Sequence, residues 1–166
     1  MCRIGTGLGE SIACADFVVF FGHGTQDEWI AVPELASAAQ PVAAIAVVDS
    51  KTIDVLDERK ACGACCWSLK GLGKTYIGKY RNTEFIGYDQ EFDFSFRNEK
   101  YFGEVVNQSI ISFVNGTPAK TVAQDLQAEW QSLKVDFKTG KLKNQQDAPA
   151  AWLAAERNSQ RVGSLP

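Results

Sequence analysis

Two short stretches constrain the fold of this chain more than any other feature. Residues 17–24 read Phe-Val-Val-Phe-Phe-Gly-His-Gly, an apolar run that ends in the chain's only histidine, His23. Residues 63–68 read Gly-Ala-Cys-Cys-Trp-Ser, a run of small residues and cysteines. Each is typical of a buried strand that carries a reactive side chain at its carboxyl end, where ligands bind in an open α/β sheet.

His23 and Cys66 are the candidate catalytic pair. A lone histidine is more often a structural residue, but glycines on both sides of a strand end favour a functional one. An imidazole can take the proton of a thiol that is distant in sequence, and these two residues are 43 positions apart. We therefore expect them within hydrogen-bonding range, or one rotamer change from it, at the C-terminal edge of a parallel sheet.

Two details of this pair stay open. Cys65 is the alternative nucleophile, because a shift of one residue turns a strand side chain to the opposite face. The backbone N–H groups of Gly24 and Cys66 are the candidate donors to an oxyanion.

Strands and helices alternate along the rest of the chain. Apolar runs predict strands at 42–48 and 84–88, and residues 71–80 predict a helix. Apolar side chains recur at three- and four-residue steps over 102–114 and 122–133, which predicts two longer helices and places Trp130 in the core. This order predicts an α/β fold with a mostly parallel sheet flanked by helices.

The expected organisation is one domain with two appendages. A glycine-rich lead covers residues 1–14, and the α/β domain covers 15–137. Residues 138–166 form a polar linker and a C-terminal helix or tail of the same domain. A length of 166 residues is typical of a single domain.

Composition excludes several functional classes. The net charge of −3 argues against a nucleic-acid partner, and no apolar run approaches the roughly 20 residues of a membrane span. Five cysteines is an odd number, and Cys62, Cys65 and Cys66 lie too close together to crosslink distant segments. These features predict free thiols in a reducing compartment, which we interpret as the cytoplasm.

The two motifs together resemble those of the caspase-like cysteine peptidases, especially their bacterial CHAT-type branch. That family has a strand followed by His-Gly, then a strand ending in Cys-x-Ser or Cys-x-Thr. Gly22-His23-Gly24 is similar to the first motif and Cys66-Trp67-Ser68 to the second, with Leu72-Gly73 after it. The resemblance covers about residues 15–133.

The resemblance implies a cysteine endopeptidase that uses no cofactor and acts on a protein or peptide. Its general base would be His23, and its nucleophile would be Cys66, which would form a thioacyl intermediate. Family members with basic specificity hold the substrate's Lys or Arg with an acidic residue. Asp89 or Glu91 would serve here, and no motif decides between them.

One departure from the family concerns the start of the domain. Family domains have a strand-helix-strand portion before the histidine strand, and we expect it to be missing here, where about fourteen residues precede that strand. An unpaired sheet edge usually demands pairing or cover. We therefore expect a homodimer or a partner chain that completes the sheet, unless the domain is a reduced variant or a fragment.

Three other functions compete with the peptidase. The first is a non-catalytic caspase-like interaction module, which the short N-terminal part favours. The second is a zinc site of Cys62, Cys65, Cys66 and His23, but adjacent cysteines on one strand point in opposite directions, and we expect no metal. The third is a tetrapyrrole chelatase, which has a similar glycine-flanked histidine but leaves Cys66-Trp67-Ser68 unexplained.

Overall fold

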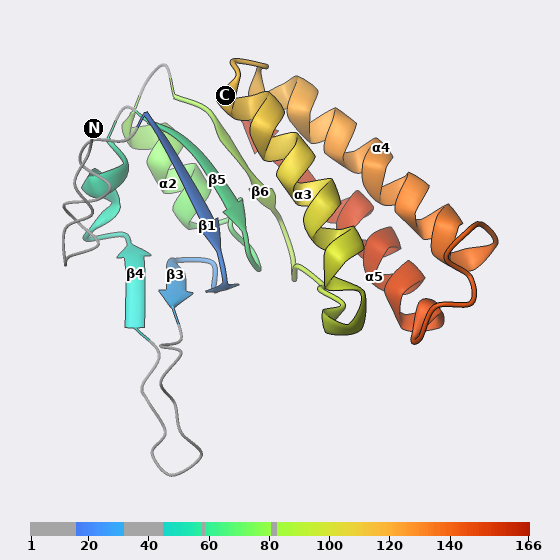
Figure 1. The fold of residues 1–166 in the computed structure, drawn as a ribbon. Coiled ribbons are helices and arrows are strands. Elements are labelled where there is room, and N and C mark those ends of the chain that lie inside the picture. The colour runs from blue at the N-terminus through green and yellow to red at the C-terminus, as the bar shows by residue number, and fades with distance from the viewer. Residues whose placement is uncertain (1–15, 32–44, 58, 81–82) are drawn as a thin grey trace, which may run out of the picture.

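A four-stranded mixed sheet forms the centre of the protein. The computed structural model describes residues 16–31, 45–57, 59–80 and 83–166. The sheet has the order β1-β5-β6-β7 (Figure 1). Strands β1 (Phe17–Phe21), β5 (Lys60–Ala64) and β6 (Phe85–Tyr88) are parallel, and β7 (Val162–Leu165) is antiparallel to β6. The predicted α/β class with a mostly parallel sheet is confirmed.

A second, antiparallel sheet of three short strands follows β1. It consists of β2 (His23–Gly24), β3 (Glu28–Ala31) and β4 (Ile45–Asp49). Within the described residues, the strand predicted at 42–48 is present as β4, but it belongs to this small sheet; residues 42–44 lie outside the described part of the chain. Val48 is buried whereas Ala46 is exposed, and the register of β4 against β3 shifts between these two residues.

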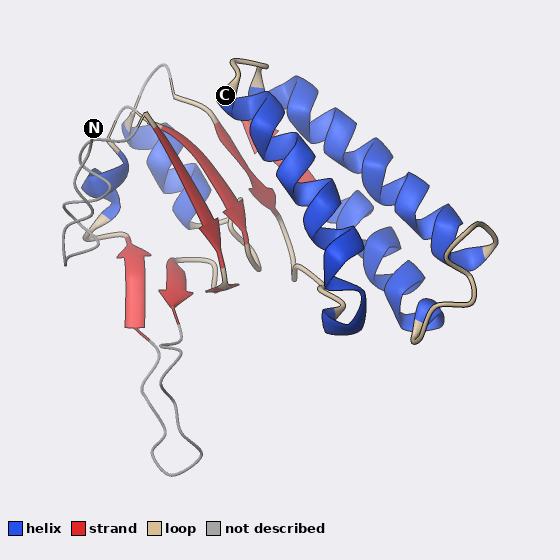
Figure 2. Cartoon of the chain, in the orientation of Figure 1, coloured by secondary structure: helices blue, strands red, loops and turns tan. Residues whose placement is uncertain are grey.

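Helices cover both faces of the central sheet (Figure 2). Helices α3 (Glu99–Val114), α4 (Ala119–Lys138) and α5 (Ala148–Arg161) lie on one face, and α2 (Leu72–Lys79) lies on the other. Two short 3-10 helices, η1 (Ile53–Leu56) and η2 (Phe96–Asn98), join these elements. Within the described ranges, no helix has both the length and the apolar character of a membrane span.

Alternating residues of the central strands build two separate cores. Cys62 and Ile86 face the three C-terminal helices and pack among Phe102, Phe113 and Trp130. The Trp130 side chain is fully buried, and its Nε1 donates a hydrogen bond to the Tyr88 hydroxyl at 3.1 Å. The prediction that Trp130 belongs to the core is confirmed.

The second core lies on the α2 side of the sheet. Cys65 and Phe85 face this side and pack with Trp29 of β3 and with Tyr76 of α2. The Phe20 ring stacks on the Trp29 indole with a centroid distance of 5.0 Å. The small sheet is thus attached to the large one by aromatic packing as well as by the chain connection at Gly22.

The prediction that the histidine strand is buried on both faces holds only in part, because Phe17 and Val19 pack against one core and Val18 and Phe20 against the other, but the end of the strand is exposed. Val18 is buried, but Phe21 is 54% exposed. The reason is position, because β5 is the only strand that pairs with β1 among the described residues, so β1 lies at the end of the sheet. The expected lead at 1–14 lies outside the described residues.

Glu84 links the sheet to the start of α4. Its carboxylate accepts a hydrogen bond from the Ala119 backbone N–H at 2.8 Å and pairs with Lys60 Nζ at 2.5 Å. Burial raises the pKa of Glu84, but the Lys60 and Ala119 hydrogen bonds lower it more, so the pKa lies below its usual value. The carboxylate also complements the positive end of the helix dipole.

We predict that Glu84→Gln lowers the free energy of unfolding by about 1 kcal/mol at pH 7. Because the folded-state pKa is lowered, the carboxylate stabilises the fold above its ordinary pKa and loses this effect as pH falls through the folded-state value. Urea denaturation between pH 3 and 7 should therefore show the two proteins converging at low pH. Glu129→Gln, an exposed site on α4, is the control and should change little; a Glu84→Gln deficit that persists at pH 3 would contradict the prediction.

Candidate functional site

The two sequence motifs meet at one edge of the central sheet. Strands β1 and β5 are adjacent and parallel, and Phe21 at the end of β1 pairs with Ala64 at the end of β5. His23 and Cys66 each follow two residues after these paired positions. Both residues therefore leave the sheet at its carboxyl edge, where the sequence predicted them.

Gly24 is in direct contact with the cysteine segment. A Cβ at this position would lie 2.7 Å from the Cys66 carbonyl oxygen and 2.8 Å from Cys65 Sγ, so no larger residue fits without movement. The hairpin turn after Gly24 is also held, because the Leu72 N–H at the start of α2 donates to the Gln26 carbonyl at 2.6 Å. The residue next to His23 is thus packed against the candidate nucleophile.

His23 is exposed and lies in the end strand of the small sheet. His23 lies in β2, opposite Ile30 of β3. Within the described residues, no hydrogen bond joins its ring to the Cys66 thiol. The expected hydrogen bond between His23 and Cys66 is therefore not observed. That one rotamer change would bring the two side chains within hydrogen-bonding range stays a prediction.

The Cys66 thiol is half-buried and contacts the loop after β6. The Phe92 backbone N–H donates to Cys66 Sγ at 3.4 Å, and Sγ lies 4.0 Å from the Phe92 carbonyl oxygen. The next residues continue this contact, since Trp67 N–H donates to Gln90 O at 2.7 Å and Leu69 N–H to Tyr88 O at 3.0 Å. Trp67 has a φ of 52°, a left-handed value rare for residues other than glycine, which makes the sharp turn after Cys66.

The other two cysteines of this stretch are poor nucleophile candidates. Burial raises the pKa of both Cys62 and Cys65 to about 12, so both stay protonated at neutral pH. They also belong to the two different cores, one on each face of the sheet. This favours Cys66 over Cys65, the alternative that the sequence left open.

The same placement bears on the zinc interpretation. Cys62 and Cys65 lie on opposite faces of the sheet, so they cannot bind one ion together. The described residues contain no group of three or more His, Cys, Asp or Glu side chains that could hold a metal.

Ser68 has a structural role that the sequence did not reveal. Its fully buried hydroxyl donates to the Gly63 carbonyl at 2.7 Å and accepts from the Tyr88 N–H at 3.0 Å. It thereby ties the turn after Cys66 to both β5 and β6. The glycines in these strands were the available signal, because glycine within a strand often marks a close approach of another backbone or side chain.

The acidic residues Asp89 and Glu91 lie on the loop that contacts Cys66, and both are exposed. The Glu91 carboxylate is 3.8 Å from Arg161 Nη2. Among the described residues, no ion pair forms at the Asp89 carboxylate. Of the two carboxylates, that of Asp89 is therefore the less engaged within the described part of the protein.

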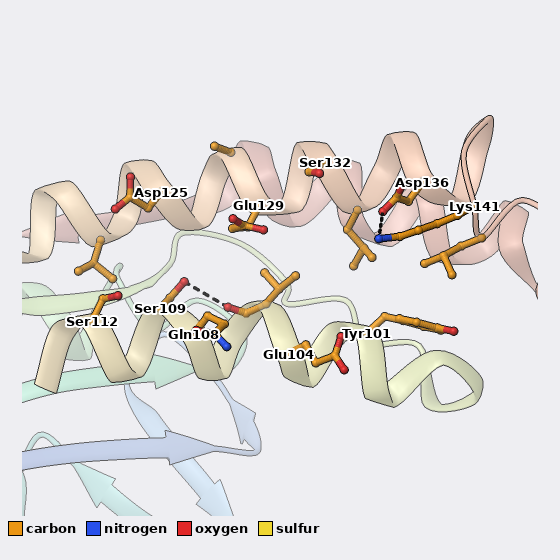
Figure 3. Close-up of a pocket in the computed structure, with 15 residues that line it drawn as sticks. Tyr101, Glu104, Gln108, Ser109, Ser112, Asp125, Glu129, Ser132, Asp136 and Lys141 are labelled. Carbon is orange, nitrogen blue, oxygen red and sulfur yellow. Dashed lines mark hydrogen bonds and ion pairs between the residues drawn. The ribbon is translucent and has the colours of Figure 1, made fainter. Parts of the chain in front are cut away.

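A separate groove of about 650 Å³ lies between α3 and α4 (Figure 3). Carboxylates such as Glu104, Asp125 and Glu129 line its walls, and Lys141 is paired with Asp136 at 3.2 Å. Neither His23 nor Cys66 lines this groove. The groove belongs to the helical layer, whereas His23 and Cys66 lie beyond the carboxyl ends of β1 and β5.

We predict that the space around the Ser68 side chain between β5 and β6 does not accommodate an added methyl group. Alanine at Gly87 would place its Cβ 2.4 Å from Ser68 Oγ, and we expect Gly87→Ala to lower the free energy of unfolding by about 2–3 kcal/mol. The cost should be smaller in a Ser68→Ala background, because the hydroxyl oxygen that clashes is absent.

Gly78→Ala in α2 is the matched control for this double-mutant cycle. Nothing lies within 4 Å of the added Cβ there, and alanine favours a helix over glycine, so the protein should gain stability or stay unchanged. Equal costs of Gly87→Ala in the two backgrounds, measured by denaturant unfolding, would show that the Ser68 contact is not the cause.

Comparisons with known proteins identify no relative of this chain. No family model, no curated protein and no solved structure matches it. What the site can do is therefore inferred from its residues and their placement alone.

Proposed function

We propose that this protein is a cysteine peptidase of the caspase-like kind, with Cys66 as nucleophile and His23 as general base. One observation supports this most directly. Adjacent parallel strands in the register Phe21 to Ala64 bring both residues to one sheet edge, and Gly24 packs against the cysteine segment. The sole histidine and the least buried described cysteine thus lie on neighbouring segments.

The proposed reaction has two stages. The His23 imidazole takes the proton of the Cys66 thiol, and the thiolate attacks the carbonyl carbon of a peptide bond. The imidazolium then protonates the leaving amine as the C–N bond breaks, which leaves a thioacyl enzyme. Water, deprotonated by the same imidazole, adds to the thioacyl carbon and releases the acid and the free thiol.

Backbone donors would stabilise the negative oxygen of the tetrahedral intermediate. Within the described part of the chain, the Cys66 N–H makes no backbone hydrogen bond, so it is available to an oxyanion. The Gly24 N–H is the proposed second donor, because its backbone lies beside the Cys66 carbonyl. One such donor contributes about 3–4 kcal/mol to transition-state stabilisation.

The proposed substrate is a protein or peptide with Lys or Arg before the cleaved bond. Asp89 would hold the basic group, with Glu91 as the less available alternative, because both lie on the loop that contacts Cys66. The three described cysteines are free thiols, as expected in a reducing compartment such as the cytoplasm.

A partner chain or second copy at β1 remains part of the proposal. Strand β1 ends the described sheet, carries no charged residue and exposes Phe21. Natural sheets usually protect such edges by pairing, cover or charge.

The second candidate is a caspase-like interaction module without catalysis. The observation that favours it is that, within the described residues, no hydrogen bond joins the Cys66 thiol to His23. The two candidates differ in the reactivity of this thiol, since only a catalytic site needs a thiolate at neutral pH.

We predict fast alkylation of Cys66 by iodoacetamide at pH 7, read by peptide mass so that each cysteine is resolved. His23→Ala should slow it at least about tenfold, since the general base is lost. Cys62 and Cys65 are the internal controls and should react slowly, because burial raises their pKa to about 12. Slow labelling that His23→Ala does not change would contradict the peptidase and favour the interaction module.

We also predict that Asp89 selects basic substrates. Asp89→Asn should reduce kcat/KM for peptides with Arg before the cleaved bond by about tenfold or more, and should leave Cys66 alkylation unchanged. Glu91→Gln is the matched control with a smaller expected effect, since Glu91 is already close to Arg161. Equal losses in both variants, measured on a fluorogenic peptide series, would contradict the assignment to Asp89.

A further inference from the structure

The loop that contacts Cys66 is held by the last turns of α5. Asn158 is fully buried, and both polar atoms of its side chain bind the backbone of one loop residue. Asp93 N–H donates to Asn158 Oδ1 at 3.0 Å, and Asn158 Nδ2 donates to the Asp93 carbonyl at 2.7 Å. This pair of bonds fixes the backbone of Asp93 directly after Phe92.

Arg161 holds the same loop on the other side of Phe92. Its Nη1 donates to the Glu91 carbonyl at 2.7 Å and to Asp93 Oδ2 at 3.0 Å, and its side chain is only 16% exposed. The Arg161 carbonyl accepts from the Asp89 N–H at 2.9 Å. Glu91 and Asp93 are thus both anchored to α5, one before and one after Phe92.

Phe92 is therefore fixed along its backbone and its side chain. Its ring packs against Tyr88, with centroids 4.7 Å apart, and against Trp130 at 6.2 Å. Its N–H is the donor that reaches Cys66 Sγ at 3.4 Å. The position of one backbone N–H at the thiol is set by a buried amide and a half-buried guanidinium far along the chain.

We propose that Asn158 and Arg161 are positioning residues that hold the Phe92 N–H on Cys66 Sγ and thereby stabilise the thiolate. A hydrogen bond donated to a charged sulfur favours the charged form over the neutral thiol. The proposal deepens the proposed peptidase function, because it assigns how the nucleophile is held ready. It concerns the thiol alone and requires no substrate.

The test measures Cys66 alkylation by iodoacetamide between pH 5 and 10 in the full chain, with peptide mass as readout. Arg161→Gln and Asn158→Ala should each raise the pH of half-maximal labelling, so that the rate at pH 7 falls about tenfold. The rate on the high-pH plateau should stay within about twofold, because the sulfur itself is unchanged.

Arg157→Gln is the matched control for charge. Arg157 lies one turn earlier on α5 and approaches Asp93 Oδ2 at 3.6 Å, but among the described residues its side chain makes no hydrogen bond to the loop backbone. The Arg157→Gln variant loses one positive charge, as Arg161→Gln does, and should leave the pH dependence of Cys66 alkylation unchanged. A similar shift in Arg157→Gln would mean that net charge, and not the position of Phe92, controls the thiol.

A merely structural role predicts a different result. Loosening the loop would then expose Cys66, which raises the plateau rate without moving the midpoint, and this outcome would overturn the proposal. If the Asn158→Ala variant does not fold, the result for Arg161→Gln alone distinguishes the positioning role from the merely structural one. Repeating the series in a His23→Ala background separates this proposal from the proposed peptidase function. If His23 is not the general base, the effect of Arg161→Gln and Asn158→Ala on the pH of half-maximal labelling can still be measured.

Discussion

The parallel pairing of β1 with β5 is the constraint on which the candidate site depends. Its register places Phe21 beside Ala64, and the residues that follow each strand then leave the sheet at the same edge. The pairing is stabilised by burial on both faces, because β5 contributes Cys62 to one core and Ala61 to the other. A shift of one residue would exchange these faces and move Cys65 to the position of Cys66.

Close approach of small residues is the second requirement of the site. Ser68 fits between β5 and β6 because Gly63 and Gly87 leave room for its hydroxyl, and the turn after Cys66 is fixed to both strands as a result. Gly24 plays the corresponding part on the histidine side. The glycines therefore set how closely the segments that carry His23 and Cys66 approach their neighbours, without carrying any chemistry themselves.

Burial distinguishes the three neighbouring cysteines. Two of them lie in apolar cores that disfavour the thiolate, whereas Cys66 lies at the end of the strand with a polar backbone beside its sulfur. The loop that supplies this contact is anchored by α5, more than sixty residues later in the chain. The C-terminal helix and strand are thus an integral part of the site's surroundings.

The sequence by itself determined the α/β class, the helices of the C-terminal half and the positions of His23 and Cys66 just after two strands of the sheet. Apolar periodicity and strand-end position are local properties, so they can be read directly. It did not reveal that β1 lies at the sheet end, that 45–49 pairs in a separate antiparallel sheet, or that Cys65 is buried while Cys66 is not. Only the tertiary structure decided these three features. It also placed Asn158 and Arg161 against the loop at Cys66, because such contacts depend on which distant segments pack together.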